Sequence, residues 1–78
     1  MAVPPVTVGR GRVTNDVRRL REAAAMTQAE LGLRVGATRQ TIIAIEAEKY
    51  APSLELAFKL ARVFERPFDD VFRFHAES

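Results

Sequence analysis

Residues 27–46, TQAELGLRVGATRQTIIAIE, decide the fold of this chain. The segment predicts two short helices joined by a tight turn. Thr27 and Glu30 have the spacing of a capping box, in which each side chain accepts a hydrogen bond from the other residue's backbone N–H. Gly36 then ends the first helix, because glycine readily takes the left-handed conformation that a sharp turn needs. Gly32 is small, so we expect the two helices to approach each other closely.

The helix after this turn is predicted to run from its cap, Thr38, to about Ala47 and to have two unlike faces. Ile42 and Ile45 lie on an apolar face that would anchor the helix on a core. The outer face is partly polar and comprises Gln40, Ile43, Ala44 and Ala47, with Arg39 beside them. Both faces are needed in a helix that is held on a core and presented to a ligand.

Further helices are predicted on either side of this pair. The first would run from about Asn15 to Ala25, with Thr14 or Asn15 as its cap. The fourth would begin after Ser53, and Pro67 would open a short fifth helix.

The segment LELAFKLARVFER, residues 54–66, is apolar around most of its circumference. Its polar side chains fall on one narrow stripe, at Glu55, Lys59, Arg62 and Arg66. A helix of this kind is buried on most sides. Because a domain of 78 residues can rarely enclose a helix so fully, the pattern favours a partner, a second copy above all.

The ends of the chain differ from this helical part. Residues 1–12 hold two Pro, two Gly and two Arg and predict a flexible arm, with a weakly signalled strand through Val6 and Val8. The predicted fold is therefore all-α: a compact five-helix domain over residues 13–74, preceded by that arm and followed by a tail over residues 75–78.

Composition excludes several classes of function. The chain has no Cys and a single His, His75, so it holds neither a disulfide nor a cluster of metal ligands, and no catalytic constellation or phosphate loop is present. We therefore predict no enzyme, cofactor or metal. No apolar run approaches the ~20 residues of a membrane span, and no signal peptide is evident, which favours the cytoplasm.

Charge is unevenly distributed, although the net charge is only +2. The first 45 residues contain seven basic and three acidic residues, whereas the remaining 33 contain five basic and seven acidic residues. The first part is thus formally +4 and the second −2. This polarity predicts a phosphate-facing end and a neutral or acidic end.

The segment from Val17 to Phe72, about 56 of 78 residues, resembles the helix-turn-helix domain of the Cro/phage-repressor (Xre-type) regulators, and most closely the small, single-domain bacterial members with a KYxPSL segment. The resemblance rests on Leu20, Arg21, Thr27-Gln28, Glu30-Leu31, Val35-Gly36, Thr38-Arg39-Gln40-Thr41-Ile42, Ile45-Glu46, Lys49-Tyr50, Pro52-Ser53-Leu54, Leu56-Ala57 and Ala61.

This resemblance implies a regulator, a repressor above all, that binds a palindromic operator in double-stranded DNA as a homodimer. Gln28 would hold a phosphate, while the recognition helix carries Thr38, Arg39, Gln40, Ile43 and Ala44. Lys49, Tyr50 and the arm residues Arg10 and Arg12 suit backbone contacts. The expected dimer surface is formed by Phe68, Val71, Phe72 and Phe74. The alternative is a protein-interaction module, such as an antitoxin-like partner, that uses the apolar C-terminal surface.

Two further features concern residues around the recognition helix. Arg21 and Glu46 match a pair that the family uses as a buried salt bridge, so we expect them to be structural. The family often has Gly where this chain has Glu48, and Leu33 stands at a position that is usually polar. Glu48 would place a negative charge near phosphate.

Overall fold

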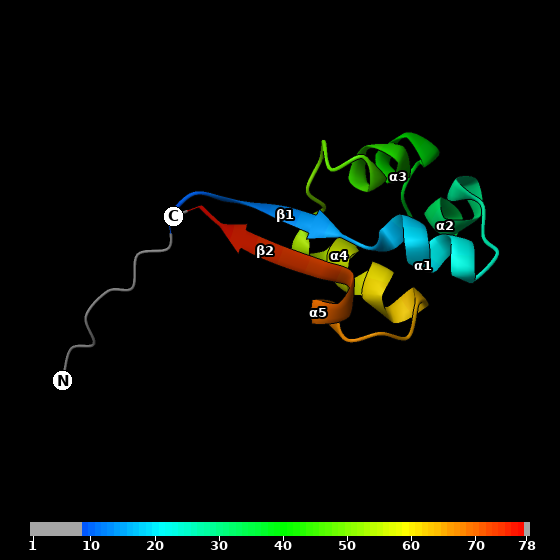
Figure 1. Ribbon diagram of the computed structural model, residues 1–78. Coiled ribbons are helices and arrows are strands. Elements are labelled where there is room, and N and C mark those ends of the chain that lie inside the picture. Colours follow the sequence, from blue (N-terminus) through cyan, green and yellow to red (C-terminus); the bar gives the residue numbers. More distant parts are fainter. Residues whose placement is uncertain (1–8, 78) are drawn as a thin grey trace.

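The computed structural model describes residues 9–77, and five helices and two strands make up this part of the chain (Figure 1). In chain order they are β1 (Gly11–Asn15), α1 (Val17–Ala23), α2 (Gln28–Val35), α3 (Arg39–Glu46), α4 (Leu54–Val63), α5 (Phe68–Val71) and β2 (Phe72–Ala76). The five predicted helices are therefore present. The possible strand through Val6 and Val8 lies outside the described residues.

The predicted caps and turn are confirmed. Thr27 and Glu30 form both hydrogen bonds of a capping box, 3.0 Å from the Glu30 N–H to the Thr27 hydroxyl and 2.9 Å from the Thr27 N–H to the Glu30 carboxylate. Gly36 has φ 71°, the left-handed conformation that the turn after α2 requires. A Cβ on Gly32 would lie 2.6 Å from the carbonyl oxygen of Ala37, so α2 and the turn pack at a distance that only glycine allows.

The core lies where the five helices meet and is almost entirely apolar. Its side chains are at most 5% exposed and come from α1 to α5 together with the first residue of β2: Val17, Leu20, Leu31, Val35, Ile42, Ile45, Ala57, Leu60, Ala61, Val71 and Phe72. Ile42 and Ile45 are both fully buried. The predicted anchoring face of α3 is thereby confirmed.

The all-α prediction is wrong in one respect, because the two ends of the described chain pair as an antiparallel sheet. Val13 lies opposite Phe74, and Arg12 lies opposite His75. The sheet extends away from the helices, and the C-terminal end lies at its far end (Figure 1). Gly11 and Arg12, which we expected in the arm, and residues 75 and 76, which we expected in the tail, are therefore strand residues.

The sheet also shortens the first helix at its beginning. Helix α1 starts at Val17 rather than at Asn15, because Asn15 is the last residue of β1. The Asn15 side chain still satisfies the helix start, since its Oδ1 accepts a hydrogen bond of 3.0 Å from the Val17 N–H. Ala24, the residue after this helix, is exposed.

Three helices end on a residue with a left-handed backbone that is not glycine. Ala25, Glu48 and Glu65 follow α1, α3 and α4 with φ of 56°, 60° and 53°. At each end two backbone hydrogen bonds close the last turn. After α3, for example, the Glu48 N–H donates to the Ile45 carbonyl and the Lys49 N–H donates to the Ala44 carbonyl, both at 3.0 Å. This is the pattern of a Schellman motif, for which glycine is the favoured residue. Glu48 thus has a left-handed backbone at the position where the family often has Gly.

Among residues 9–77, no helix is long and apolar enough to cross a membrane.

Candidate nucleic-acid interface

The amino-terminal end of α3 presents a short exposed row of polar side chains. Thr38, Arg39 and Gln40 are all exposed, whereas Ile43 and Ala44 one turn further on are half-buried. The Thr38 hydroxyl caps the helix by accepting from the Thr41 N–H at 3.1 Å. Because Ile42 and Ile45 hold the opposite face in the core, this row has a fixed position relative to the rest of the domain.

A buried carboxylate holds the helices around that row together. The Arg21 guanidinium donates to both oxygens of Glu46, at 2.7 and 3.1 Å, and also to the Met26 carbonyl at 2.9 Å. The two side chains are only 11% and 5% exposed. The hydrogen bond with Glu46 raises the pKa of Arg21, so the guanidinium stays charged. The buried ion pair that the resemblance implied is therefore present and links α1 to α3.

The same carboxylate positions Gln28, the first residue of α2. The Gln28 side-chain amide donates a hydrogen bond of 3.2 Å to Glu46 Oε1. An amide nitrogen carries two hydrogens, so one N–H is used inside the protein and the other is available to an anion. Glu46 thus fixes both Arg21 and Gln28 with its two oxygens.

These residues surround an open cleft of about 660 Å³. Its walls come from α1, α2 and α3 and include Arg18, Gln28, Arg39 and Ile43, and Arg21 and Glu46 also line it. Arg18 was not predicted as a site residue. The sequence did hold a signal for Arg18 as a site residue, because Arg18 precedes Arg21 by one helical turn on the same predicted helix.

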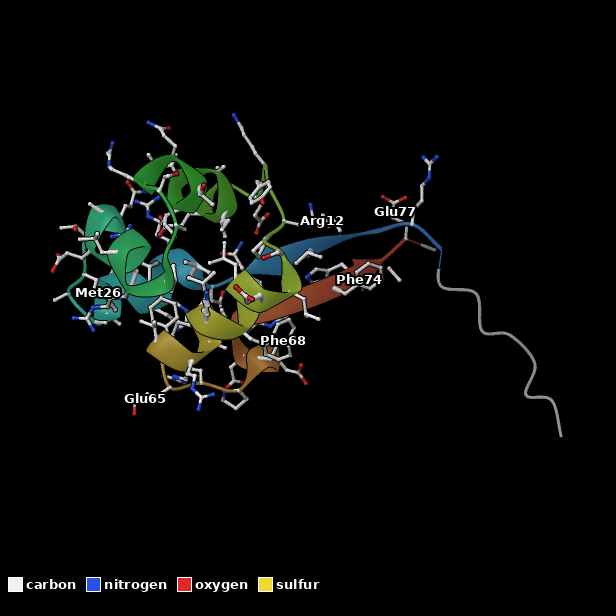
Figure 2. All side chains as sticks on the ribbon, turned by 180° about the vertical axis from the view of Figure 1, so that it is seen from behind. Arg12, Met26, Glu65, Phe68, Phe74 and Glu77 are labelled. Carbon is white, nitrogen blue, oxygen red and sulfur yellow. The ribbon has the colours of Figure 1, made fainter. Side chains whose placement is uncertain are left out.

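Lys49 and Tyr50 lie beyond the other end of α3, where both are exposed. They line a smaller hollow of about 290 Å³ together with Arg12 of β1 and the left-handed Glu48. Figure 2 marks Arg12 on this strand. The strand therefore places one of the two predicted arm arginines beside the predicted backbone contacts. The carboxylate of Glu48 lies in the same hollow.

Asn15 ties this end of α3 to the sheet, a contact that was not predicted from the sequence. Its side-chain amide donates to the Ile45 carbonyl at 2.9 Å, and its backbone N–H donates to Glu48 Oε2 at 3.4 Å. Only the helix-capping role of Asn15 was predicted, because the other bonds join residues at least 30 positions apart.

The residues predicted for a dimer surface separate into two groups. Val71 is fully buried and Phe72 is 5% exposed, so both belong to the core, although Phe72 also lines the groove described below. Phe68 is half-buried and Phe74 is 54% exposed. Figure 2 labels both aromatic residues, Phe68 on α5 and Phe74 on β2, and both line an apolar groove of about 400 Å³.

Other exposed apolar side chains adjoin that groove. Val13 of β1 and Leu54 of α4 line it, and Phe58 of α4 packs on Phe68 with ring centroids 5.2 Å apart. Leu54 is 68% and Phe58 54% exposed. We call the set Val13, Leu54, Phe58, Phe68 and Phe74 the apolar surface. It includes the side of α4 that we expected a partner to cover.

Comparison with known proteins identifies a family and a fold. A helix-turn-helix family model (HTH_3) matches residues 17–71. An uncharacterised HTH-type transcriptional regulator of Archaeoglobus fulgidus is 48% identical over 62 residues, which cover 80% of this chain and 87% of that protein. The uncharacterised HTH-type transcriptional regulator YgzD of Bacillus subtilis is 44% identical over 64 residues, with 82% and 97% covered.

Two solved structures share the fold at 20% sequence identity. One is a candidate DNA-binding protein from Bacteroides fragilis, with a TM-score of 0.71 over 78% of this chain and 98% of the other. The second is the transcriptional regulator VanUg, with a TM-score of 0.70 over 95% and 100%. The family is one of DNA-binding regulators and not of enzymes, in agreement with the sequence analysis. The chain belongs to the Xre/Cro-type helix-turn-helix family.

Proposed function

We propose that this protein is a sequence-specific DNA-binding transcription regulator that acts on a palindromic operator as a homodimer. The observation that carries the proposal is the exposed row Thr38, Arg39 and Gln40 on a helix whose other face is fully buried. A recognition helix needs this combination, because its first residues contact base edges in the major groove while the rest of the domain holds it in place.

The side chains of α3 suit direct readout of bases. Gln pairs bidentately with adenine N6 and N7, Arg pairs with guanine O6 and N7, and an apolar side chain packs on the thymine methyl group. In this proposal Gln40 and Arg39 read base edges, and the half-buried Ile43 and Ala44 contact methyl groups. Thr38, at the start of the helix, would lie next to the DNA backbone.

Contacts to phosphate would hold the domain in register on the duplex. Gln28 has a free N–H directed by Glu46, and Lys49 and Tyr50 are exposed beyond the far end of α3. Contacts of this kind position a protein without specifying a sequence. Gln28 bonds to Glu46, the last residue of α3, and Lys49 and Tyr50 follow that residue, so both groups would hold the carboxyl-terminal end of the recognition helix.

We propose that the apolar surface joins two copies. It includes exposed side chains from α4 and both strands and the half-buried Phe68 of α5, and Asp69 and Arg73 line the same groove with opposite charges. Arg73 pairs with Asp16 at 3.0 Å and its side chain is still 46% exposed, so in a two-fold dimer it can also face Asp69 of the other copy. The recognition helices of such a dimer would lie about one DNA turn apart, roughly 34 Å.

A matched pair of leucine substitutions tests the dimer. Leu54→Ser changes an exposed leucine on the apolar surface, and Leu33→Ser changes one on α2 that is 85% exposed and lies outside it. Analytical ultracentrifugation at micromolar concentration is expected to show a dimer for the unchanged protein and for Leu33→Ser, and dissociation for Leu54→Ser. A monomeric unchanged protein, or equal assembly of the two variants, would contradict the homodimer.

Repression is the regulatory outcome we propose, because a small domain seated on an operator excludes other proteins from that DNA. Such a regulator would work in the cytoplasm. Selection of bound sequences from random duplex DNA, run at two salt concentrations, tests binding and specificity together. We expect an enriched palindrome and a steep loss of affinity with salt, since neutralised phosphates release counterions. No enrichment and a flat salt response would refute DNA binding.

The apolar surface also supports a second candidate function, that of an antitoxin-like partner for another protein. In that case a different protein would cover Leu54 and Phe58. Co-purification from the native host decides between the two: a second protein bound in fixed ratio, released by Leu54→Ser but not by Leu33→Ser, favours the partner.

A further inference from the structure

Arg18, the second residue of α1, has a charge that the fold uses only weakly. Its side chain is 71% exposed, and it pairs with Glu22, one turn further along the same helix, at 3.4 Å. Exposed pairs of this kind contribute little to stability. The guanidinium of Arg18 is therefore free to turn to a stronger anion.

The position of Arg18 shows where such an anion would lie. Arg18 lines the cleft of about 660 Å³ that Gln28 and Arg39 also line. Helices α1, α2 and α3 thus each contribute at least one polar side chain with N–H donors to the same concavity. The one carboxylate in this cleft, Glu46, already accepts two hydrogen bonds from Arg21. The positive charges of Arg18 and Arg39 are consequently not cancelled within the cleft.

We propose that Arg18 is a further contact to a backbone phosphate of bound DNA, which makes α1 part of the interface. This inference rests on the proposed function. Gln28 would offer its second amide hydrogen and Arg18 its guanidinium, and guanidinium groups form short, often bidentate hydrogen bonds with phosphate. The cleft is much larger than one phosphate group and is continuous with Arg39 on the recognition helix. A strand of the duplex fits that shape better than a free ion.

The side chain has no part in base readout. Arg18 lies on α1, whereas the helix presented to the groove is α3. A contact from a helix outside the groove adds affinity for every sequence equally and contributes to the salt dependence. These two properties distinguish Arg18 from Gln40 in an experiment.

The test compares four proteins on a duplex of random sequence: the unchanged protein, Arg18→Ala, Arg18→Lys and Arg62→Ala. Arg62 is an exposed arginine of α4 that lines a different hollow, so its removal changes the net charge equally without touching the cleft. The dissociation constant is measured from about 50 to 200 mM salt. The logarithm of the binding constant falls linearly with the logarithm of the salt concentration. We expect Arg18→Ala to make this fall less steep, by about 0.9 in slope for each protomer bound. Arg62→Ala should leave the slope unchanged, and Arg18→Lys should keep most of it.

The outcomes separate this inference from the function on which it rests. Equal slopes for Arg18→Ala and Arg62→Ala, with normal binding by the unchanged protein, would overturn the role of Arg18 and leave DNA binding intact. A loss of affinity on a selected operator but not on random DNA would make Arg18 a base reader and also overturn it. If the unchanged protein does not bind DNA at all, the proposed function itself fails.

Discussion

Arg21 and Glu46 form a two-point ion pair, with guanidinium nitrogens 2.7 and 3.1 Å from the two carboxylate oxygens. The pair joins α1 to the last residue of the recognition helix, and Glu46 also receives the Gln28 amide. Among residues 9–77 no buried side-chain nitrogen or oxygen lacks a hydrogen-bond partner. The geometry of the proposed phosphate contact therefore depends on a carboxylate that is 5% exposed.

Removing one member of this pair should lower the free energy of unfolding far more than replacing both members. Arg21→Ala leaves the Glu46 carboxylate buried without its ion-pair partner, which typically costs about 3–5 kcal/mol. The double change Arg21→Met with Glu46→Leu removes both charges and should recover most of that loss. Urea denaturation of the three proteins measures the effect. An Arg21→Ala protein as stable as the unchanged one would mean that the pair is not structural.

The left-handed residue after α1 offers a stabilising substitution. Ala25 has φ 56° at the end of a Schellman turn, where an L-residue costs roughly 1–2 kcal/mol that glycine avoids. The greater freedom of glycine in the unfolded chain takes back part of this gain. We expect Ala25→Gly to stabilise the protein by about 0.5–1 kcal/mol.

The same substitution two residues earlier provides the control for Ala25→Gly. Ala23 is exposed and is the last residue of α1, so Ala23→Gly should destabilise the protein by roughly 0.5–1 kcal/mol. Thermal unfolding should move in opposite directions for the two variants. A shift in the same direction would contradict the backbone conformation assigned to Ala25.

Acid should weaken the junction between the sheet and α1. The carboxylate of Asp16 accepts from Arg73 and from Arg19, both at 3.0 Å, and these bonds lower the pKa of Asp16 below its ordinary value of 3.8. Because the folded-state pKa is the lower one, the stabilisation is present above pH 3.8 and is lost as the pH falls through the folded-state pKa. Asp16→Asn should reduce this acid dependence, measured as the free energy of unfolding between about pH 2 and 6.

The pKa of Glu30 is also lowered, mainly by the hydrogen bond from the Thr27 backbone N–H. Its contribution to acid sensitivity has the same sign and remains in the Asp16→Asn protein. An identical pH profile for Asp16→Asn and the unchanged protein would show that the Asp16 cluster contributes nothing to stability.

The helical part of the fold was predictable because its signals are local. Thr27 with Glu30, Thr38, Ser53 and Gly36 each act over at most four residues, and all of them have the predicted role. The ion pair between Arg21 and Glu46 came from the family pattern and not from any local rule. Its two residues are 25 positions apart.

The sheet escaped prediction because it depends on pairing between the two ends of the chain. Arg12 and His75 are opposite each other across 63 positions, and neither strand is long or strongly alternating. Position 11 needs a glycine, because the Phe74 ring and the His75 carbonyl occupy the space that a side chain would take. No pattern within the single strand 11–15 shows such a contact. The same pairing carries Phe74 out of the predicted tail and onto the apolar surface.

The central claim, that the exposed start of α3 reads DNA sequence, is tested most directly at Gln40. The affinity of the Gln40→Ala protein is measured on the selected operator and on operators changed at each base pair. Gln28→Ala is the matched control. We predict that Gln40→Ala costs about 1–3 kcal/mol on the operator and removes the preference at one base pair per half-site, while Gln28→Ala weakens binding to all sequences alike. Equal weakening of all sequences by Gln40→Ala would contradict the account.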